Sequence, residues 1–289
     1  MVRSPLTRQA VTLLAFLLGS SVFGSSLCMA GDGKLLATAG LTQLEGSGGG
    51  GIVPWATLSG YDTEDETSAS AFFTEVDVDD YRLQSKGVAL SWNDRIELSF
   101  ARQRFTLKTL SADIHQNIVA LKTRLYGDVI YSRWPQVALG VQHKQLLDGD
   151  IAKALGAENN QSGNDLYLAA TKVQLGALSG YNLVWNITAR ATQANQTGLL
   201  GYGGENNKNY QLVFEGSAGI LLSPSLAVGV EYRQKPDNLS IEEQDWQDVF
   251  ITYIPDKRVN FTLAYADLGD IAAAGKQQGV YLSMTGYVW

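Results

Sequence analysis

The feature that most constrains the fold is a strict alternation of large apolar residues with small or polar ones along several segments. In residues 181–190 the first set is Tyr, Leu, Trp, Ile and Ala, and it alternates with Asn, Val, Asn, Thr and Arg. Residues 226–233 and 259–266 repeat the pattern. Because successive side chains of a strand point to opposite faces, each segment predicts a β-strand with one apolar face and one small or polar face.

Two kinds of barrel contain such strands, and they differ in the direction of the apolar face. A secreted soluble barrel that binds a ligand turns this face inward and needs Lys and Glu outside. Here the second face holds mainly Ala, Gly, Ser, Thr and Asn, which suits a narrow lumen. The pattern therefore favours an all-β, transmembrane, antiparallel up-and-down β-barrel. Finding Leu183, Trp185, Phe261 and Leu263 at the centre of the folded molecule would overturn this prediction and favour the soluble alternative.

The connections between predicted strands alternate between short and long, as periplasmic turns and outward-facing loops do in outer-membrane barrels. The stretch 62–80 is acidic and lacks a period of two, so it is predicted as a loop. About twelve strands result, over residues 52–61, 81–92, 95–107, 117–130, 136–147, 165–175, 181–194, 210–222, 226–234, 248–254, 259–268 and 279–289.

Both ends of the chain fit an exported barrel. Arg3 and Arg8 precede a short apolar run, and Cys28-Met29-Ala30 offers a small-residue cleavage site, which together predict a secretory signal peptide. The last strand ends on Trp289, an aromatic that suits a membrane–water interface. We expect a signal peptide over 1–30, a short N-terminal glycine-rich arm or plug over 31–51, and the barrel over 52–289. Barrel-assembly machinery is expected to engage the C-terminal strand.

The start of the expected mature chain resembles a known family. Residues 34–46 read Lys-Leu-Leu-Ala-Thr-Ala-Gly-Leu-Thr-Gln-Leu-Glu-Gly, and after a run of glycines Ile52-Val53-Pro54-Trp55-Ala56 follows. This opening resembles the bacterial family called domain of unknown function 3034. The resemblance implies a Gram-negative envelope protein and an outer-membrane barrel, located in the bacterial cell outer membrane. It implies no activity, and so it assigns no role to any residue.

Charged residues recur at positions with the parity of the lumen. They form a charged constriction if the lumen is open, or an ion-pair network that fills it if the lumen is closed, because buried charges need partners. The network is the preferred interpretation for a barrel of this size. The predicted lumen cluster comprises Lys122, Arg124, Lys172, Arg190, Arg233, Glu97, Glu215 and Glu231.

Glycines and aromatics add two further expectations. Gly48, Gly49, Gly50 and Gly51 are predicted to act as a flexible hinge that lets the arm fold into the lumen as a plug. Aromatic residues near strand ends are expected to form an interfacial girdle on the lipid face. That set comprises Trp92, Trp134, Tyr131, Tyr253, Tyr287 and Trp289, although this parity also turns Thr285 and Ser283 of the last strand outward.

Catalysis and metal binding find little support in the sequence. His143 is expected on the lipid face near the outer end of its strand, where a lipid hydrolase would act, but no serine lies two residues away. The acids of residues 62–80 lack the spacing of a calcium loop, so we expect neither a metal site nor a cofactor.

The predicted function follows from these exclusions. A net charge of −7 without a basic stripe excludes a nucleic-acid partner. We expect an outer-membrane barrel in contact with outer-membrane lipid, without enzymatic activity. It is either a narrow, porin-like pore for small solutes or a closed barrel with a structural or interaction role. A lipid hydrolase at the outer rim and a secreted soluble binding protein are the alternatives.

Overall fold

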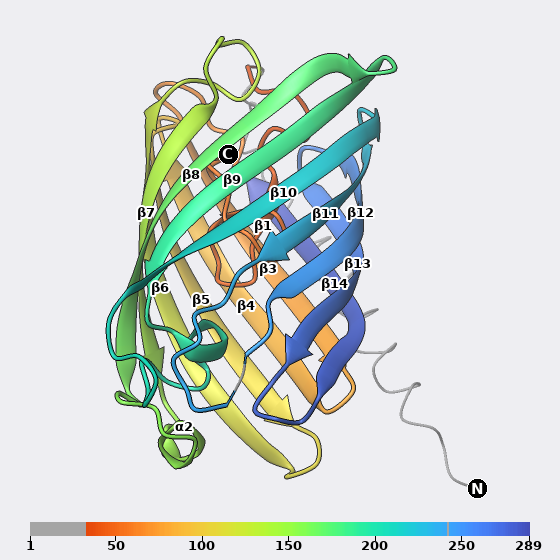
Figure 1. The fold of residues 1–289 in the computed structure, drawn as a ribbon. Coiled ribbons are helices and arrows are strands. Elements are labelled where there is room, and N and C mark those ends of the chain that lie inside the picture. The colour runs from red at the N-terminus through yellow and green to blue at the C-terminus, as the bar shows by residue number, and fades with distance from the viewer. Residues whose placement is uncertain (1–32, 242) are drawn as a thin grey trace, which may run out of the picture. The chain divides into compact units, whose positions relative to one another are not determined.

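The computed structural model describes residues 33–241 and 243–289. The predicted signal peptide, residues 1–30, lies outside the described residues. Within the described part, twelve antiparallel strands form a closed barrel (Figure 1). In order around the barrel they are β3 (Thr67–Val78), β4 (Tyr81–Trp92), β5 (Ile96–Leu107), β6 (Ala112–Tyr126), β7 (Gln136–Leu146), β8 (Ser162–Leu178), β9 (Tyr181–Thr192), β10 (Gln211–Ser223), β11 (Leu226–Arg233), β12 (Trp246–Asp256), β13 (Val259–Asp270) and β14 (Lys276–Val288).

The barrel closes between its last and its first strand. Residues 279–288 of β14 pair with residues 69–78 of β3, and every other strand pairs with its neighbours in the sequence. This closure leaves no unpaired sheet edge, which is the condition for strands to cross a bilayer. The predicted up-and-down barrel of about twelve strands is confirmed.

One predicted strand and one predicted loop are wrong. Residues 52–61 are not a barrel strand, because they lie buried inside the barrel. The first barrel strand is β3, in the stretch predicted as an acidic loop. In β3 the inward face carries Ser68, Phe72 and Val76, and the outward face carries Ala71, Phe73 and Glu75, so neither face is uniformly apolar. The hydrophobic alternation that marks the other strands is therefore absent from β3.

The outward face of the barrel is apolar. Phe261 and Leu263 are 40% and 48% exposed, while Asn260, Thr262 and Ala264 between them point inward and are buried. Leu183 and Trp185 are half-buried at outward positions of β9. Large exposed apolar side chains recur on all strands, as they do on a lipid-facing surface. Among the described residues, no helix is long and apolar enough to cross a membrane.

The two ends of the barrel differ in their connections. One end, at the bottom of Figure 1, holds the helix α2 (Asp150–Ala154) and the 3-10 helix η2 (Asn195–Gly198). We call it the outer end, because the three longest connections of the barrel lie there, over residues 147–161, 193–210 and 234–245. The inner end holds the C-terminus and the hairpin turns at 179–180, 224–225 and 257–258.

In the closing strand, the inward and outward faces are exchanged relative to the prediction. Tyr281, Thr285 and Tyr287 are buried inside the barrel, whereas Leu282 and Val288 are outward and exposed. Placing the aromatics outward would have turned Ser283 and Thr285 toward lipid, and the observed parity places the aliphatic side chains there instead.

Tyr287 and Trp289 therefore do not belong to an interfacial girdle. Tyr287 packs edge-on against Tyr61 with 5.4 Å between ring centroids, and Trp289 lies 5.5 Å from the same ring. Both aromatics help to hold residue Tyr61, at the end of the chain segment that lies inside the barrel.

Candidate functional site in the barrel interior

The lumen is occupied by the chain itself. Residues 39–62, which we call the interior segment, are buried throughout. Within it the short strands β1 (Leu41–Thr42) and β2 (Gly48–Gly49) pair with each other. Figure 1 shows this part of the chain in orange-red, within the ring of strands. The predicted arm ended at residue 51, and the observed segment continues to Asp62 before β3 begins.

Lumen side chains satisfy the backbone polar groups of the interior segment. Gln136 Nε2 donates to the carbonyl of Ala56 at 2.7 Å, and the Ala56 N–H donates to Thr171 Oγ1 at 2.8 Å. Ser85 Oγ and Gln103 Nε2 both donate to the carbonyl of Leu44. A buried irregular segment is tolerated only when its backbone groups are paired in this way. The polar face of the barrel is thus complementary to one particular occupant.

The glycine-rich tip of the interior segment lies between two carboxylates. Glu97 accepts hydrogen bonds from the backbone N–H groups of Gly48, at 3.1 Å, and Ser59, at 2.6 Å. Glu231 accepts from Gly51 at 2.6 Å and from Ile52 at 2.8 Å. The two side chains therefore fasten the tip to opposite parts of the wall.

The four glycines are not a hinge between the arm and the barrel, as the sequence suggested. They lie within the interior segment, where there is no room for a side chain. A Cβ on Gly50 would lie 1.8 Å from Glu231 Oε1, and one on Gly49 would lie 2.5 Å from the carbonyl oxygen of Val53. Glycine is needed here because it lets the backbone approach its neighbours closely.

A second group of contacts holds the carboxylate of Glu45. It is fully buried, and Lys144, Arg190 and Arg233 surround it. Arg233 Nη1 lies 3.0 Å and Arg190 Nη2 lies 3.5 Å from Glu45 Oε2, and Lys144 Nζ contacts Oε1. Burial would raise the pKa of Glu45, but the charges of Arg233, Lys144 and Arg190 outweigh it and hold this pKa well below its usual range.

The three cations around Glu45 also pair with the barrel wall. Lys144 Nζ lies 2.6 Å from Asp165 Oδ2, and Arg190 Nε lies 2.5 Å from Glu215 Oε1. Arg190 reaches Asp165 as well, at 3.1 Å. The wall thus contributes three cations and two carboxylates, and Glu45 supplies the third carboxylate. We call these six residues the Glu45 network.

Chain from the outer end closes the lumen from the other side. The carbonyl of Thr197 in η2 accepts from Lys144 Nζ at 3.1 Å and from Gln116 Nε2 at 3.3 Å. The 193–204 connection therefore reaches the Glu45 network, and Leu199 and Leu200 are buried beside it. The interior segment and the outer connection meet at Lys144.

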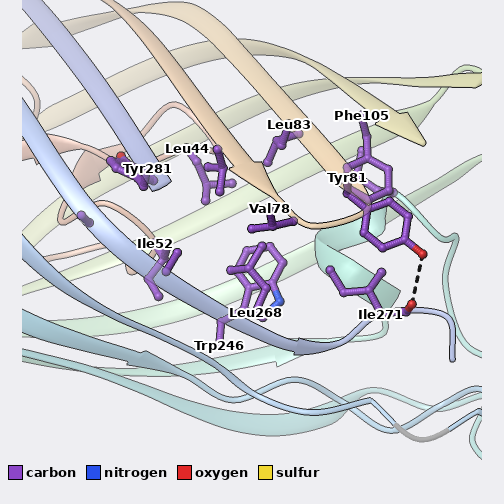
Figure 2. Packing of buried hydrophobic residues seen from close by; sticks show 14 of the residues in the cluster. Leu44, Ile52, Val78, Tyr81, Leu83, Phe105, Trp246, Leu268, Ile271 and Tyr281 are labelled. Atoms are coloured by element: carbon purple, nitrogen blue, oxygen red, sulfur yellow. Dashed lines mark hydrogen bonds between the residues drawn. The ribbon is translucent and has the colours of Figure 1, made fainter. Parts of the chain in front are cut away.

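Apolar side chains fill the outer half of the barrel. Figure 2 shows Leu44 and Ile52 of the interior segment facing residues from the strands. Tyr81 and Phe105 stack with 5.0 Å between ring centroids, and Tyr81 Oη donates to the carbonyl of Ile271 at 3.1 Å. Among the described residues, apolar side chains of the strands and the interior segment therefore fill this part of the lumen.

Six of the eight residues predicted for the lumen cluster lie around the interior segment. Glu97 and Lys122 form one ion pair, at 3.4 Å, and Lys122 Nζ also donates to the carbonyls of Gly48 and Thr57, both at 2.7 Å. Arg190, Arg233 and Glu215 belong to the Glu45 network, and Glu231 holds the glycine tip.

The other two predicted residues lie apart, near the inner end. Arg124 donates to the carbonyl of Gly127 at 2.6 Å and contacts Asp94. Lys172 Nζ donates to the carbonyl of Ile130 at 3.0 Å and to that of Ser132. Both therefore hold the 127–135 connection rather than the interior segment.

Sequence reasoning missed three members of the Glu45 network. Lys144 follows His143 in β7, so the outward parity assigned to His143 already placed Lys144 inside. Asp165 stood at the edge of a predicted strand, where parity was ambiguous. No sequence pattern pointed to Glu45, because residues 39–62 lack the two-residue alternation from which the lumen side chains were predicted.

The remaining predicted aromatics are at outward positions. Tyr131, Trp134 and Tyr253 are exposed, and Trp92 is half-buried at the inner end of β4. They stand where an aromatic girdle would lie.

His143 is exposed on the outward face, as its parity predicted, and its Nδ1 lies 2.8 Å from Asn164 Oδ1 on β8. Among residues 33–241 and 243–289, no serine, threonine or cysteine hydrogen-bonds to this ring. The hydrolase alternative therefore has no assembled nucleophile and base in the described chain. In the same part of the chain, no group of three or more His, Cys, Asp or Glu residues is placed to hold a metal ion.

Comparison with known proteins gives a family and several similar folds. The model of the family described as "Protein of unknown function (DUF3034)" matches residues 38–285. None of the curated proteins matches the chain in sequence. Similar solved structures include the outer membrane protein Omp33 of Acinetobacter baumannii, with 9% identity, 78% of this chain and 99% of that chain covered, and a TM-score of 0.45.

Two further solved structures show a similarity of the same order. The KdgM porin has 9% identity and a TM-score of 0.47, with 75% of this chain and 98% of that chain covered. Outer membrane phospholipase A of Escherichia coli has 9% identity and a TM-score of 0.38, with 76% and 92% covered. Similarities this low carry no conclusion about a solute or a reaction.

Proposed function

The chain belongs to this family of unknown function, and we propose that it is a bacterial outer-membrane β-barrel that its own interior segment keeps closed. In this proposal the resting barrel does not conduct, and small solutes pass only when residues 39–62 leave the lumen. The apolar outward face supports placement in a membrane, and the long connections at one end support the orientation of an outer-membrane barrel.

The observation that carries the proposal is the fastening of the interior segment at three separate places. Glu97 and Lys122 hold one side of the glycine tip, Glu231 holds the other, and the Glu45 network holds the chain between them and the outer end. Each fastening uses a buried ionisable side chain, and such groups are retained in an interior only with good partners. Their number favours a stable closed state over an open pore with a loosely folded arm.

Conductance in planar bilayers tests this function. Purified, refolded wild type is expected to give rare openings or none, and a variant lacking residues 31–62 is expected to give steady conductance. The double variant Glu97→Gln/Glu231→Gln should open intermittently, because the tip loses the two carboxyl groups that each accept two of its backbone N–H groups. Glu158→Gln is the matched control, since Glu158 pairs with Lys208 on the exposed surface.

Heat-dependent gel mobility shows whether each variant forms the barrel, so a silent variant that failed to fold is recognised. A correctly folded deletion variant that does not conduct would refute the proposal that residues 39–62 close the lumen. Co-sedimentation of the wild type with the inner membrane would refute the outer-membrane placement.

A further inference from the structure

Four polar side chains lie in one row on the outward face of the barrel. Lys86 of β4 pairs in register with Arg102 of β5, Arg102 with Asn117 of β6, and Asn117 with Gln145 of β7. Lys86, Arg102 and Gln145 are exposed, and Asn117 is half-buried. The row therefore presents an ammonium group, a guanidinium group and two amides to the outside, with no carboxylate among them.

No side chain of this row has a partner in the described protein. Within residues 33–241 and 243–289, none of the four makes a side-chain hydrogen bond or an ion pair, and Asn117 Oδ1 is buried without one. The adjacent cations Lys86 and Arg102 stand directly opposite each other, an arrangement that destabilises a sheet unless an anion lies between them.

Nearby carboxylates are already committed to other cations. Asp113 pairs with Arg104 at 2.7 Å, and Asp77 pairs with Arg82 and with Lys108. These groups lie farther toward the outer end than the row. Arg82 on β4 and Arg104 on β5 are thus neutralised, whereas Lys86 and Arg102 on the same two strands have no counter-charge.

On β4, β5 and β6 the row marks the boundary of the apolar belt, whereas on β7 the next outward position is the polar His143. The next outward positions toward the inner end are Val88, Phe100 and Val119, which pair with one another in register and are 52%, 42% and 47% exposed. Toward the outer end the outward positions are polar. A lipid whose chains cover Val88, Phe100 and Val119 would therefore bring its head group to Lys86 and Arg102.

From this juxtaposition we infer that the row Lys86, Arg102, Asn117 and Gln145 binds the phosphate of a phosphorylated glycolipid in the outer leaflet. The inference rests on the proposed outer-membrane placement, which puts the outer end in that leaflet. A guanidinium group donates two parallel hydrogen bonds to a phosphate, and the ammonium group adds a second charge. The amides of Asn117 and Gln145 donate to sugar or phosphate oxygens beside it.

A free phosphate ion explains these features less well than a lipid. The row lies on the outward face of the barrel, and on β4, β5 and β6 it is flanked on its inner side by exposed apolar residues, which a small ion would not contact. Acyl chains on the belt supply the hydrophobic contribution that holds the head group in place. The two sources separate experimentally, because inorganic phosphate should compete poorly with the lipid.

Binding is tested with the folded full chain in nanodiscs of phosphatidylcholine that contain bisphosphorylated lipid A, monophosphorylated lipid A or neither. Native mass spectrometry counts the lipid retained on the barrel. Wild type should retain both phosphorylated lipids in preference to phosphatidylcholine, and Lys86→Gln/Arg102→Gln should retain about a hundredfold less of them, since each of the two lost charge-assisted contacts contributes about tenfold. Arg95→Gln/Arg133→Gln removes the same charge at the inner end and should match wild type.

The outcomes distinguish binding of the lipid from an alternative in which the long side chains of the row only extend into water. Equal retention of lipid by wild type and by Lys86→Gln/Arg102→Gln would overturn the inference, as would equal retention of phosphorylated lipid A and phosphatidylcholine by the wild type. Efficient competition by millimolar inorganic phosphate would assign the site to a free ion and would also overturn it. None of these readouts depends on conductance, so the plug proposal stands or fails separately.

Discussion

Replacing Glu45 with glutamine should loosen the interior segment without unfolding the barrel. Removing one partner of a buried, hydrogen-bonded ion pair costs about 3–5 kcal/mol, because the opposite charge stays buried. Glutamine has nearly the same volume as glutamate and retains one acceptor oxygen. The cations around it still have Asp165 and Glu215 as partners, so we expect a cost at the lower end of this range. A loss of about 3 kcal/mol raises the population in which the segment has left the lumen about a hundredfold.

Thiol labelling measures this population directly. Cys28, the only cysteine of the chain, lies in the predicted signal peptide. Thr42→Cys then supplies a single thiol inside the barrel, at a side chain that is fully buried. Reaction with a water-soluble maleimide should be about a hundredfold faster when Glu45→Gln is added, in the limit of rapid reclosure.

The control and the refuting result are both specific. Adding Glu158→Gln instead should leave the labelling rate within about twofold, because its ion pair with Lys208 is exposed. An unchanged rate in the Glu45→Gln variant would refute the reasoning that the Glu45 network holds the segment. Faster labelling together with loss of heat-dependent mobility would show global unfolding, and it would refute the claim that the segment leaves a barrel that stays intact.

The pH dependence of the same assay follows from the lowered pKa of Glu45. A carboxyl group whose folded pKa is depressed contributes its full stabilisation above the ordinary value of 4.5, and loses it as the pH falls through the lower folded pKa. Labelling corrected for maleimide chemistry should therefore be flat between pH 5 and pH 8. It should rise only below the ordinary value, and an increase near pH 6 would contradict the assignment.

Three further predictions test other parts of the structure. Gly50→Ala forces the interior segment away from Glu231 and should cost about 1–3 kcal/mol of segment binding, measured by the same labelling. Leu263→Arg should destabilise the barrel in lipid vesicles by about 2–4 kcal/mol in urea titrations, and no loss would contradict a lipid-facing surface. Burial raises the pKa of Glu243 to about 7, so the 234–245 connection should be cut faster by protease at pH 8 than at pH 5, and Glu243→Gln should remove the difference.

The barrel could be predicted because its wall obeys one rule. Eleven of the twelve strands were found at or near their observed positions, since lipid outside and a polar interior impose the period of two. The count of about twelve was correct in spite of two opposite errors. Residues 52–61 were assigned to the wall in place of β3, whose outward face carries Glu75 and Asp77 and whose inward face carries Val76 and Val78.

That reversal in β3 has a physical cause at the outer end of the barrel. The outward acids lie beyond the apolar belt, where Asp77 meets Arg82 and Lys108 in water. The inward valines join the apolar packing that fills the outer half of the lumen. The hydrophobic alternation along a strand identifies its lipid-facing side only where the barrel interior is polar. It fails where the interior is apolar as well.

The interior segment could not be placed from its residues because its order comes from the wall. Its backbone bonds mostly to side chains of the strands, and its own backbone–backbone hydrogen bonds are fewer, in β1 and β2 and in the turns beside them. The wall still carries evidence of an occupant. Around Glu45 it offers three cations against two carboxylates, all buried, and a barrel without the segment would leave an uncompensated charge there. Excess buried charge of one sign in a predicted lumen therefore indicates a missing partner, and in this chain that partner lies in residues 39–62.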